Sequence, residues 1–104
     1  MNTPLHDLFG LLGRRHALAV VWHLRGPATS FAGLASALAV SPTVLTQRLR
    51  ELREAGLIEL DEAGDYRLTT HGRRLQGPLD QLTAFAEHWS QLTPRQRTPR
   101  GSSE

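Results

Sequence analysis

Four polar side chains between residues 43 and 50 are of the types that contact the base edges and phosphates of double-stranded DNA. Gln47 can form two hydrogen bonds with adenine, and Arg50 can form two with guanine. Thr43 and Thr46 can contact phosphates or the methyl group of thymine. Their spacings of three and four residues place all four side chains on one face if the segment is helical. The pattern therefore predicts a surface that enters a DNA major groove.

The segment 41–55 carries the start and stop signals of such a helix. Ser41 is a favoured cap residue, Pro42 suits the first helical position, and Gly56 suits the position just past the end. The unpaired backbone amides at a helix start attract phosphate, so Ser41 and Pro42 join the predicted DNA contacts. Three leucines share the opposite face and are expected to anchor the helix in the core: Leu45, Leu49 and Leu52.

A simpler interpretation of the same polar face is an ordinary solvated helix surface. Arginine, glutamine and threonine are common on exposed helices, and Glu51 and Glu54 are placed to form ion pairs with neighbouring arginines. The face alone does not separate the two interpretations. The order of the elements around it favours DNA contact.

The periodicity of the whole chain predicts a mainly α fold with one small β-hairpin, in the order of a winged helix-turn-helix. In this order the first helix of a tightly connected pair packs across the second, and the outer face of the second protrudes. A hairpin follows the pair. The expected helices span residues 4–12, 18–24, 30–38 and 41–55, and a last helical region starts at Thr69 or Thr70. The expected strands span residues 57–60 and 66–68.

The apolar spacing of the last helix predicts a homodimer. The last helix carries apolar residues at spacings of 4, 3, 4 and 3, which is the pattern of a coiled coil, and Pro78 is expected to kink it. The alternative is that this apolar stripe packs on its own domain. The apolar stripe comprises Leu75, Leu79, Leu82, Ala86 and Trp89. The part of the predicted dimer interface that lies on this helix comprises Leu79, Leu82, Ala86 and Trp89.

Most of the chain, from about residue 8 to residue 89, resembles the HxlR-type winged-helix transcriptional regulators. The matching segments are LTQRLREL at 45–52, EAGLI at 54–58 and YRLT at 66–69, with Gly72 and Leu75 following. The resemblance implies a homodimer built by the first and last helices, with helix 41–55 contacting DNA. It adds Leu5, Leu8 and Leu12 of the first helix to the predicted dimer interface. Two such helices related by a two-fold axis would lie about 34 Å apart, so a palindromic operator is expected.

The resemblance also implies that the hairpin wing approaches the DNA backbone or the minor groove. The wing tip of this chain carries three acidic residues, Asp61, Glu62 and Asp65, which repel phosphate. Arg67 is the one basic residue of the hairpin and completes the predicted DNA contacts.

Composition excludes several classes of function. The sequence has 104 residues, which is one domain, and it has no cysteine, so disulfides, thiolate metal sites and cysteine-based sensing are excluded. The five histidines lack the spacing of metal ligands, so no metal site is expected. The sequence shows no nucleophile–base arrangement and no phosphate-binding loop, so neither an enzyme nor a cofactor is expected. The start lacks the order of a signal peptide and no apolar run could span a membrane, so a cytoplasmic location is expected.

Charge distribution leaves one competing function open. Residues 1–92 hold nine arginines and nine acidic residues, whereas 93–104 hold three arginines and one acidic residue. We therefore expect a neutral folded domain at 1–92 and a disordered basic tail at 93–104. The competing function is a winged-helix protein-interaction module that has lost DNA binding. A small-molecule effector is also possible, at an interface cavity lined by Trp22 and Trp89.

Overall fold

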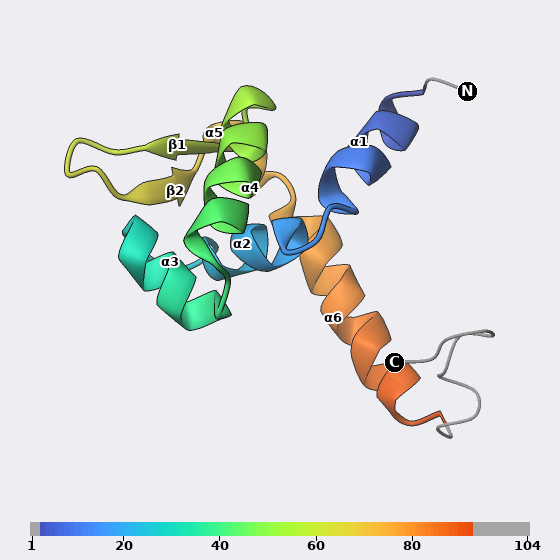
Figure 1. Cartoon of the computed structure of the whole chain (residues 1–104). Coiled ribbons are helices and arrows are strands. Elements are labelled where there is room, and N and C mark those ends of the chain that lie inside the picture. Colours follow the sequence, from blue (N-terminus) through green and yellow to red (C-terminus); the bar gives the residue numbers. More distant parts are fainter. Residues whose placement is uncertain (1–2, 93–104) are drawn as a thin grey trace.

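The structure, a computed structural model, describes residues 3–92, which form six helices and two strands (Figure 1). The predicted mainly α fold with one antiparallel hairpin is confirmed. The tail at 93–104 lies outside the described residues. The elements are α1 (Pro4–Leu12), α2 (Ala17–His23), α3 (Phe31–Leu38), α4 (Pro42–Glu54), β1 (Ile58–Leu60), β2 (Tyr66–Leu68), α5 (Thr70–Arg73) and α6 (Gln76–Ser90).

Side-chain caps fix the starts of α3 and α4. The hydroxyl of Ser30 accepts a hydrogen bond from the backbone N–H of Gly33, and that of Ser41 accepts one from Val44. Each bond satisfies an amide that has no partner within its helix. Gly56 follows α4 with a φ of 80°, which is the left-handed conformation that commonly ends helices. The predicted boundaries of the helix pair therefore hold to within about one residue.

The core lies between α2, α3, α4 and the inner face of the hairpin. It is entirely apolar, and no polar or charged residue of the described chain is buried. The register pairs Ile58 with Leu68, so both face inward, and Thr29 adds an isolated bridge to Tyr66 beside the hairpin. The most deeply buried side chains are Val20, Val21, Leu24, Leu34, Leu45, Leu49 and Leu52.

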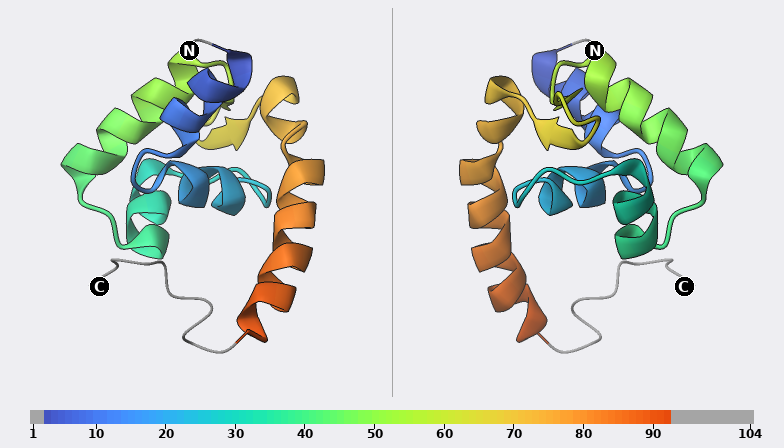
Figure 2. Two further views of the ribbon diagram at one scale, coloured as in Figure 1. Left: turned by 90° about the vertical axis from the view of Figure 1, so that its right-hand side faces the viewer. Right: turned by 90° about the vertical axis from the view of Figure 1, so that its left-hand side faces the viewer.

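The helices at the two ends of the chain lie away from the hairpin tip. In Figure 1, α1 and α6 both extend from the body on the side opposite that tip. Figure 2 shows that α4 and α6 lie on opposite sides of the body, with α2 between them. Helix α6 therefore does not cover α4, whereas α1 lies near the C-terminal end of α4, where Leu8 and Leu11 border a pocket with Ala55.

The last helical region differs from the expected single kinked helix. It is divided into α5 and α6, and the division falls at Arg74 and Leu75, before Pro78. Pro78 is the third residue of α6, where a backbone N–H would have no partner within the helix. The predicted kink at Pro78 is therefore wrong, because the proline lies in a first turn and not in a helix interior.

Helix α2 also differs from the fully buried helix that its composition suggests. Ala17, Val20 and Val21 are buried, but Leu18 and Trp22 are exposed, with 46% of Trp22 accessible to solvent. One side of α2 thus contributes to the core, and the other contributes to an apolar surface. Among the described residues, no helix is long and apolar enough to cross a membrane.

Candidate nucleic-acid interface

Helix α4 has the orientation that the leucine spacing predicts. Its three leucines are at most 2% exposed, and the side chains of Thr43, Thr46, Gln47 and Arg50 are all exposed. Three buried leucines fix the rotation of the helix about its axis, so the polar face points away from the protein. The structure brings these four predicted residues together on one surface, and their contacts with DNA stay predictions.

The start of α4 lies at the edge of the same surface. Ser41 and Pro42 are both exposed, and the Ser41 hydroxyl caps the Val44 amide at 3.3 Å. The amides of the first turn carry partial positive charge from the helix dipole. This end of the helix is suited to a phosphate, as the sequence predicts.

Gln47 and Arg50 are available for hydrogen bonds to another molecule. Gln47 Nε2 lies 3.4 Å from a carboxylate oxygen of Glu51, which is a long and weak contact. Within residues 3–92, no hydrogen bond or ion pair holds the side chain of Arg50. Arg50 instead borders a concave surface of about 670 Å³ between α4 and the hairpin, together with Arg53, Glu59 and other residues.

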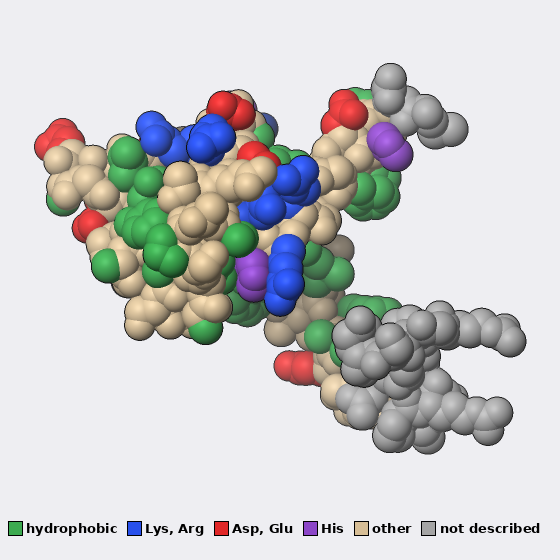
Figure 3. Space-filling view, in the orientation of Figure 1, with side chains coloured by type: hydrophobic (Ala, Val, Ile, Leu, Met, Phe, Trp, Pro, Cys, Tyr) green, Lys and Arg blue, Asp and Glu red, His purple; other side chains and the backbone are tan. Residues whose placement is uncertain are grey.

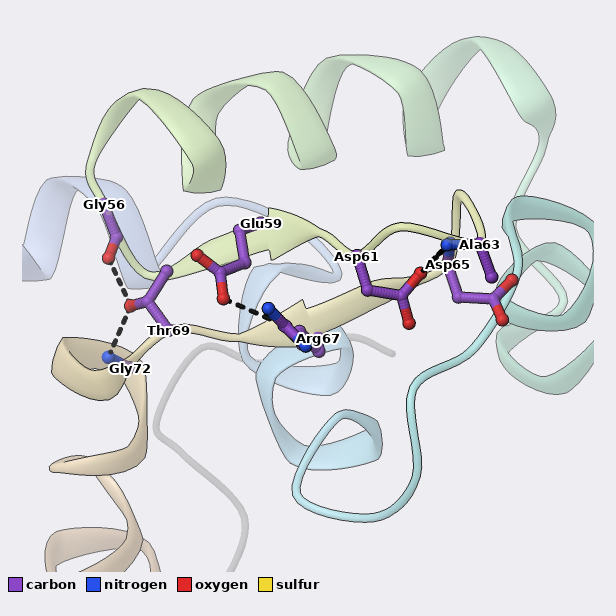
Figure 4. Close-up of polar contacts among 8 residues, drawn as sticks. All are labelled: Gly56, Glu59, Asp61, Ala63, Asp65, Arg67, Thr69 and Gly72. Carbon is purple, nitrogen blue, oxygen red and sulfur yellow. Dashed lines mark hydrogen bonds and ion pairs between the residues drawn. The ribbon is translucent and has the colours of Figure 1, made fainter.

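The hairpin offers little free positive charge. Arg67 Nε donates to Glu59 across the two strands at 2.9 Å, and both side chains are about half exposed (Figure 4). At the tip, a carboxylate oxygen of Asp61 accepts hydrogen bonds from the backbone amides of Ala63 and Asp65, both at 2.9 Å. The tip is therefore held by an acidic side chain. Arg67 lies on the wing as predicted, but its charge is shared with Glu59.

A buried glycine attaches α5 to the base of the hairpin. The Thr69 hydroxyl donates to the carbonyl of Gly56 and accepts from the amide of Gly72 (Figure 4). A Cβ atom at Gly72 would lie 2.1 Å from the carbonyl oxygen of Leu57. This close approach permits only glycine, and it fixes where the chain leaves the hairpin toward α6.

A network of three arginines and one carboxylate joins α4 to the α1–α2 connection, residues 13–16. Glu51 forms ion pairs with Arg48 at 2.7 Å and with Arg14 at 3.1 Å. Arg48 Nε also donates to the carbonyl oxygen of Arg15 at 3.0 Å. Burial opposes the ionisation of Glu51, but the hydrogen bond from Arg48 and the charges of Arg14 and Arg48 outweigh it, so the pKa of Glu51 is lowered.

Arginine side chains gather over α4 and beside it toward the start of α2, as Figure 3 shows, whereas acidic groups occupy the hairpin tip. The sequence predicts an ion pair between Glu51 and an arginine of its own helix, and this is confirmed. The contacts of Arg14 and Arg15 with α4 are not predicted, because they join residues about 33 positions apart. The sequence signal that could have indicated these contacts is the pair of arginines, Arg14 and Arg15, just before α2.

The predicted interface residues fall into two groups. Leu79 is 6% exposed and belongs to the core, Leu12 packs against the core, and Leu8 is half-buried. Leu5 and Leu82 are more than half exposed. The remaining two, Ala86 and Trp89, are exposed as well.

Four large apolar residues on α1, α2 and α6 are exposed but were not among the predicted interface residues. They are Phe9, Leu18, Trp22 and Phe85. An apolar groove of about 550 Å³ lies between α2 and α6, and its lining includes Trp22 and Leu82 but not Trp89. This groove therefore contains one of the two tryptophans, and the expected interface cavity stays a prediction. Among residues 3–92, no group of three or more histidine or acidic side chains could hold a metal ion.

Comparison with known proteins agrees with this architecture. The family model described as HxlR-like helix-turn-helix matches residues 11–94. The quinone-bound crystal structure of YodB from B. subtilis is similar to this chain with a TM-score of 0.77 and 26% identity, over 85% of this chain and 99% of that one. No curated protein matched the sequence.

A second similar structure is that of ytcD, described as a putative HTH-type transcriptional regulator. Its TM-score is 0.74 with 25% identity, over 84% of this chain and 96% of that one. These relatives are transcriptional regulators and not enzymes. Because the family model matches most of the chain, the chain belongs to the HxlR-like helix-turn-helix family and is a DNA-binding transcription regulator.

Proposed function

We propose that this protein binds a palindromic operator in double-stranded DNA as a homodimer, with the outer face of α4 in the major groove. The observation that carries the proposal is the orientation of α4. Its leucines are buried, and Gln47 and Arg50 point away from the protein without a strong partner. A protruding helix fits into a major groove, which is about 12 Å wide.

The exposed apolar surface supports the homodimer. Side chains from α1, α2 and α6 leave more than a third of their surface in water, and they lie on elements that adjoin one another. Clusters of exposed apolar side chains commonly mark sites of protein–protein interaction. The residues are Leu5, Phe9, Leu18, Trp22, Leu82, Phe85 and Trp89.

The two interpretations of the apolar stripe apply to different parts of α6. Its first part packs on its own domain through Leu79, whereas Leu82 and the residues after it are exposed. Arg25 fixes the direction of the helix, because it forms an ion pair with Asp80 at 2.7 Å while lying 4.1 Å from the centre of the Trp22 ring. The exposed part of α6 is therefore held in place for a second copy.

A two-fold axis that runs parallel to the direction in which α4 projects would place both α4 helices on the same side of the dimer. Identical interfaces on two copies give a closed dimer. Two copies of α4 on one face of the duplex would then contact half-sites one helical turn apart, at about 34 Å. This is the basis for the palindromic operator.

A small apolar effector would find its site in the same region. The YodB structure is described as quinone-bound. This chain has no cysteine, so an effector here would bind without a thiol. The groove between α2 and α6 is the apolar site it would occupy, and a shift in melting temperature with added aromatic compounds would measure such binding.

The experiment that tests the proposal is a mobility-shift titration against genomic DNA fragments at two salt concentrations. A protein that makes 6–10 phosphate contacts should lose about 10³–10⁵ in affinity between about 50 and 200 mM salt. A double variant with Gln47→Ala and Arg50→Ala should lose preference among fragments while it keeps its fold. If the protein shifts no fragment at low salt, the competing function, a protein-interaction module, is favoured instead.

A further inference from the structure

The two sides of α4 differ in charge. The hairpin lies along one side, with an acidic tip and with Arg67 paired to Glu59. The α1–α2 connection lies along the other side and carries Arg14 and Arg15 (Figures 1 and 3). A helix in the major groove has a phosphate backbone on each side of it. One of these backbones would face the acidic wing, and the other would face the arginines.

The α1–α2 connection is fixed to α4 by the Arg48 side chain. Only 11% of this side chain is exposed, and its guanidinium contacts both Glu51 and the carbonyl oxygen of Arg15. His16, next in the chain, has a φ of 72°, which is uncommon for a residue other than glycine. The connection therefore keeps one position relative to α4, although it lies outside the helix-turn-helix pair.

The Arg15 side chain is free to bind an anion. This side chain is exposed, and within residues 3–92 no hydrogen bond or ion pair engages its guanidinium. The contact of Arg15 with Arg48 uses only the backbone carbonyl of Arg15. Its neighbour Arg14 shares the carboxylate of Glu51 with Arg48. Two guanidinium groups, those of Arg14 and Arg48, pair with the single carboxylate of Glu51, so the site keeps a net positive charge even without Arg15. A guanidinium suits phosphate because its planar fork can donate two hydrogen bonds.

We infer that the α1–α2 connection is a second phosphate-binding element, and that Arg15 contacts the DNA backbone on the side of α4 away from the wing. This inference rests on the proposed function. It names a contact outside both the α4 face and the hairpin. The connection supplies the backbone contact that the acidic wing tip does not favour. Arg48 and Glu51 are positioning residues for it.

The test compares Arg15→Ala with wild-type protein on two duplexes, one selected genomic fragment and one of random sequence. Binding is measured by fluorescence anisotropy at several salt concentrations from about 50 to 200 mM. Arg15→Ala should weaken binding to both duplexes by the same factor, and the slope of log affinity against log salt should fall by about one for each protomer that contacts DNA. Arg15→Lys should restore most of the slope, since it keeps the charge.

The matched control is Arg73→Ala, which removes an exposed arginine from α5, on the side of the body away from α4 (Figure 2). It should leave affinity and salt slope unchanged. Because alanine keeps the carbonyl that accepts from Arg48, Arg15→Ala should melt at the wild-type temperature.

Three outcomes would overturn the inference, and they are distinguishable. If Arg15→Ala binds both duplexes with wild-type affinity and slope while Arg50→Ala weakens binding, the inference fails and the proposed function stands. If Arg15→Ala weakens binding to the selected fragment alone, Arg15 contacts a base and not a phosphate. If the wild-type protein binds neither duplex at about 50 mM salt, the proposed function fails and the inference fails with it.

Discussion

Replacing Leu82 with glutamate should dissociate the proposed dimer without unfolding the protomer. The Leu82 side chain lies on α6 and is 55% exposed in the single chain, so the core does not depend on it. Full burial of a leucine contributes about 1.5–3 kcal/mol, so burial of the exposed half by a partner would contribute about 0.8–1.5 kcal/mol. A two-fold interface contains Leu82 twice, which raises the loss to about 1.6–3 kcal/mol per dimer.

This loss corresponds to a dissociation constant raised about 15- to 150-fold, and the repulsion between two buried carboxylates adds to it. Sedimentation equilibrium over a range of protein concentrations measures the constant directly. The matched control is Gln81→Glu, which places the same charge on the neighbouring exposed residue of α6. The reasoning about α6 is wrong if both Leu82→Glu and Gln81→Glu have the dissociation constant of the wild type, or if the wild-type protein is a monomer.

Three further predictions concern α4 and the base of the hairpin. Arg50→Ala should cost about 1–3 kcal/mol in operator binding and relax the preference at one base pair of each half-site; an equal loss on every sequence would restrict Arg50 to a phosphate. Gly72→Ala should lower the melting temperature strongly, because its Cβ would meet the Leu57 carbonyl, whereas Gly77→Ala, with nothing within 4 Å, should leave it unchanged or raise it slightly. Because the pKa of Glu51 is lowered from its ordinary value of 4.5, its ionised form stabilises the fold above that value. This stability is lost as the pH falls through the lowered pKa that Glu51 has in the folded protein. As the pH drops below about 4.5, the free energy of unfolding should therefore decrease less in Glu51→Gln than in the wild type.

Local signals in the sequence predict the helix-turn-helix and its orientation well. Ser30 and Ser41 cap helices with their own hydroxyls, and Gly56 ends α4 in the left-handed conformation. Each of these signals acts within a few residues, so it can be recognised without knowing the fold. The leucine spacing of α4 likewise fixes which face is buried. These features account for all four outward side chains of the candidate site.

Features that depend on contacts between distant segments are not predictable in this way. The break before Pro78 follows directly after such a contact, the close approach of Gly72 to the Leu57 carbonyl. A heptad-like spacing shows that one face of α6 is apolar, but it does not show which residues meet the protein's own core. The attachment of the Arg15 carbonyl to Arg48 is likewise visible only once the chain is folded.

Selection of bound duplexes from a random DNA library tests the central claim most directly. If two copies of α4 face DNA about a two-fold axis, the selected sequences should contain an inverted repeat whose half-sites are centred about 34 Å apart, or about 10 base pairs. The same selection with a Gln47→Ala and Arg50→Ala variant should lose that repeat. Selected sequences without any shared element, or with a single unrepeated site, would contradict the account.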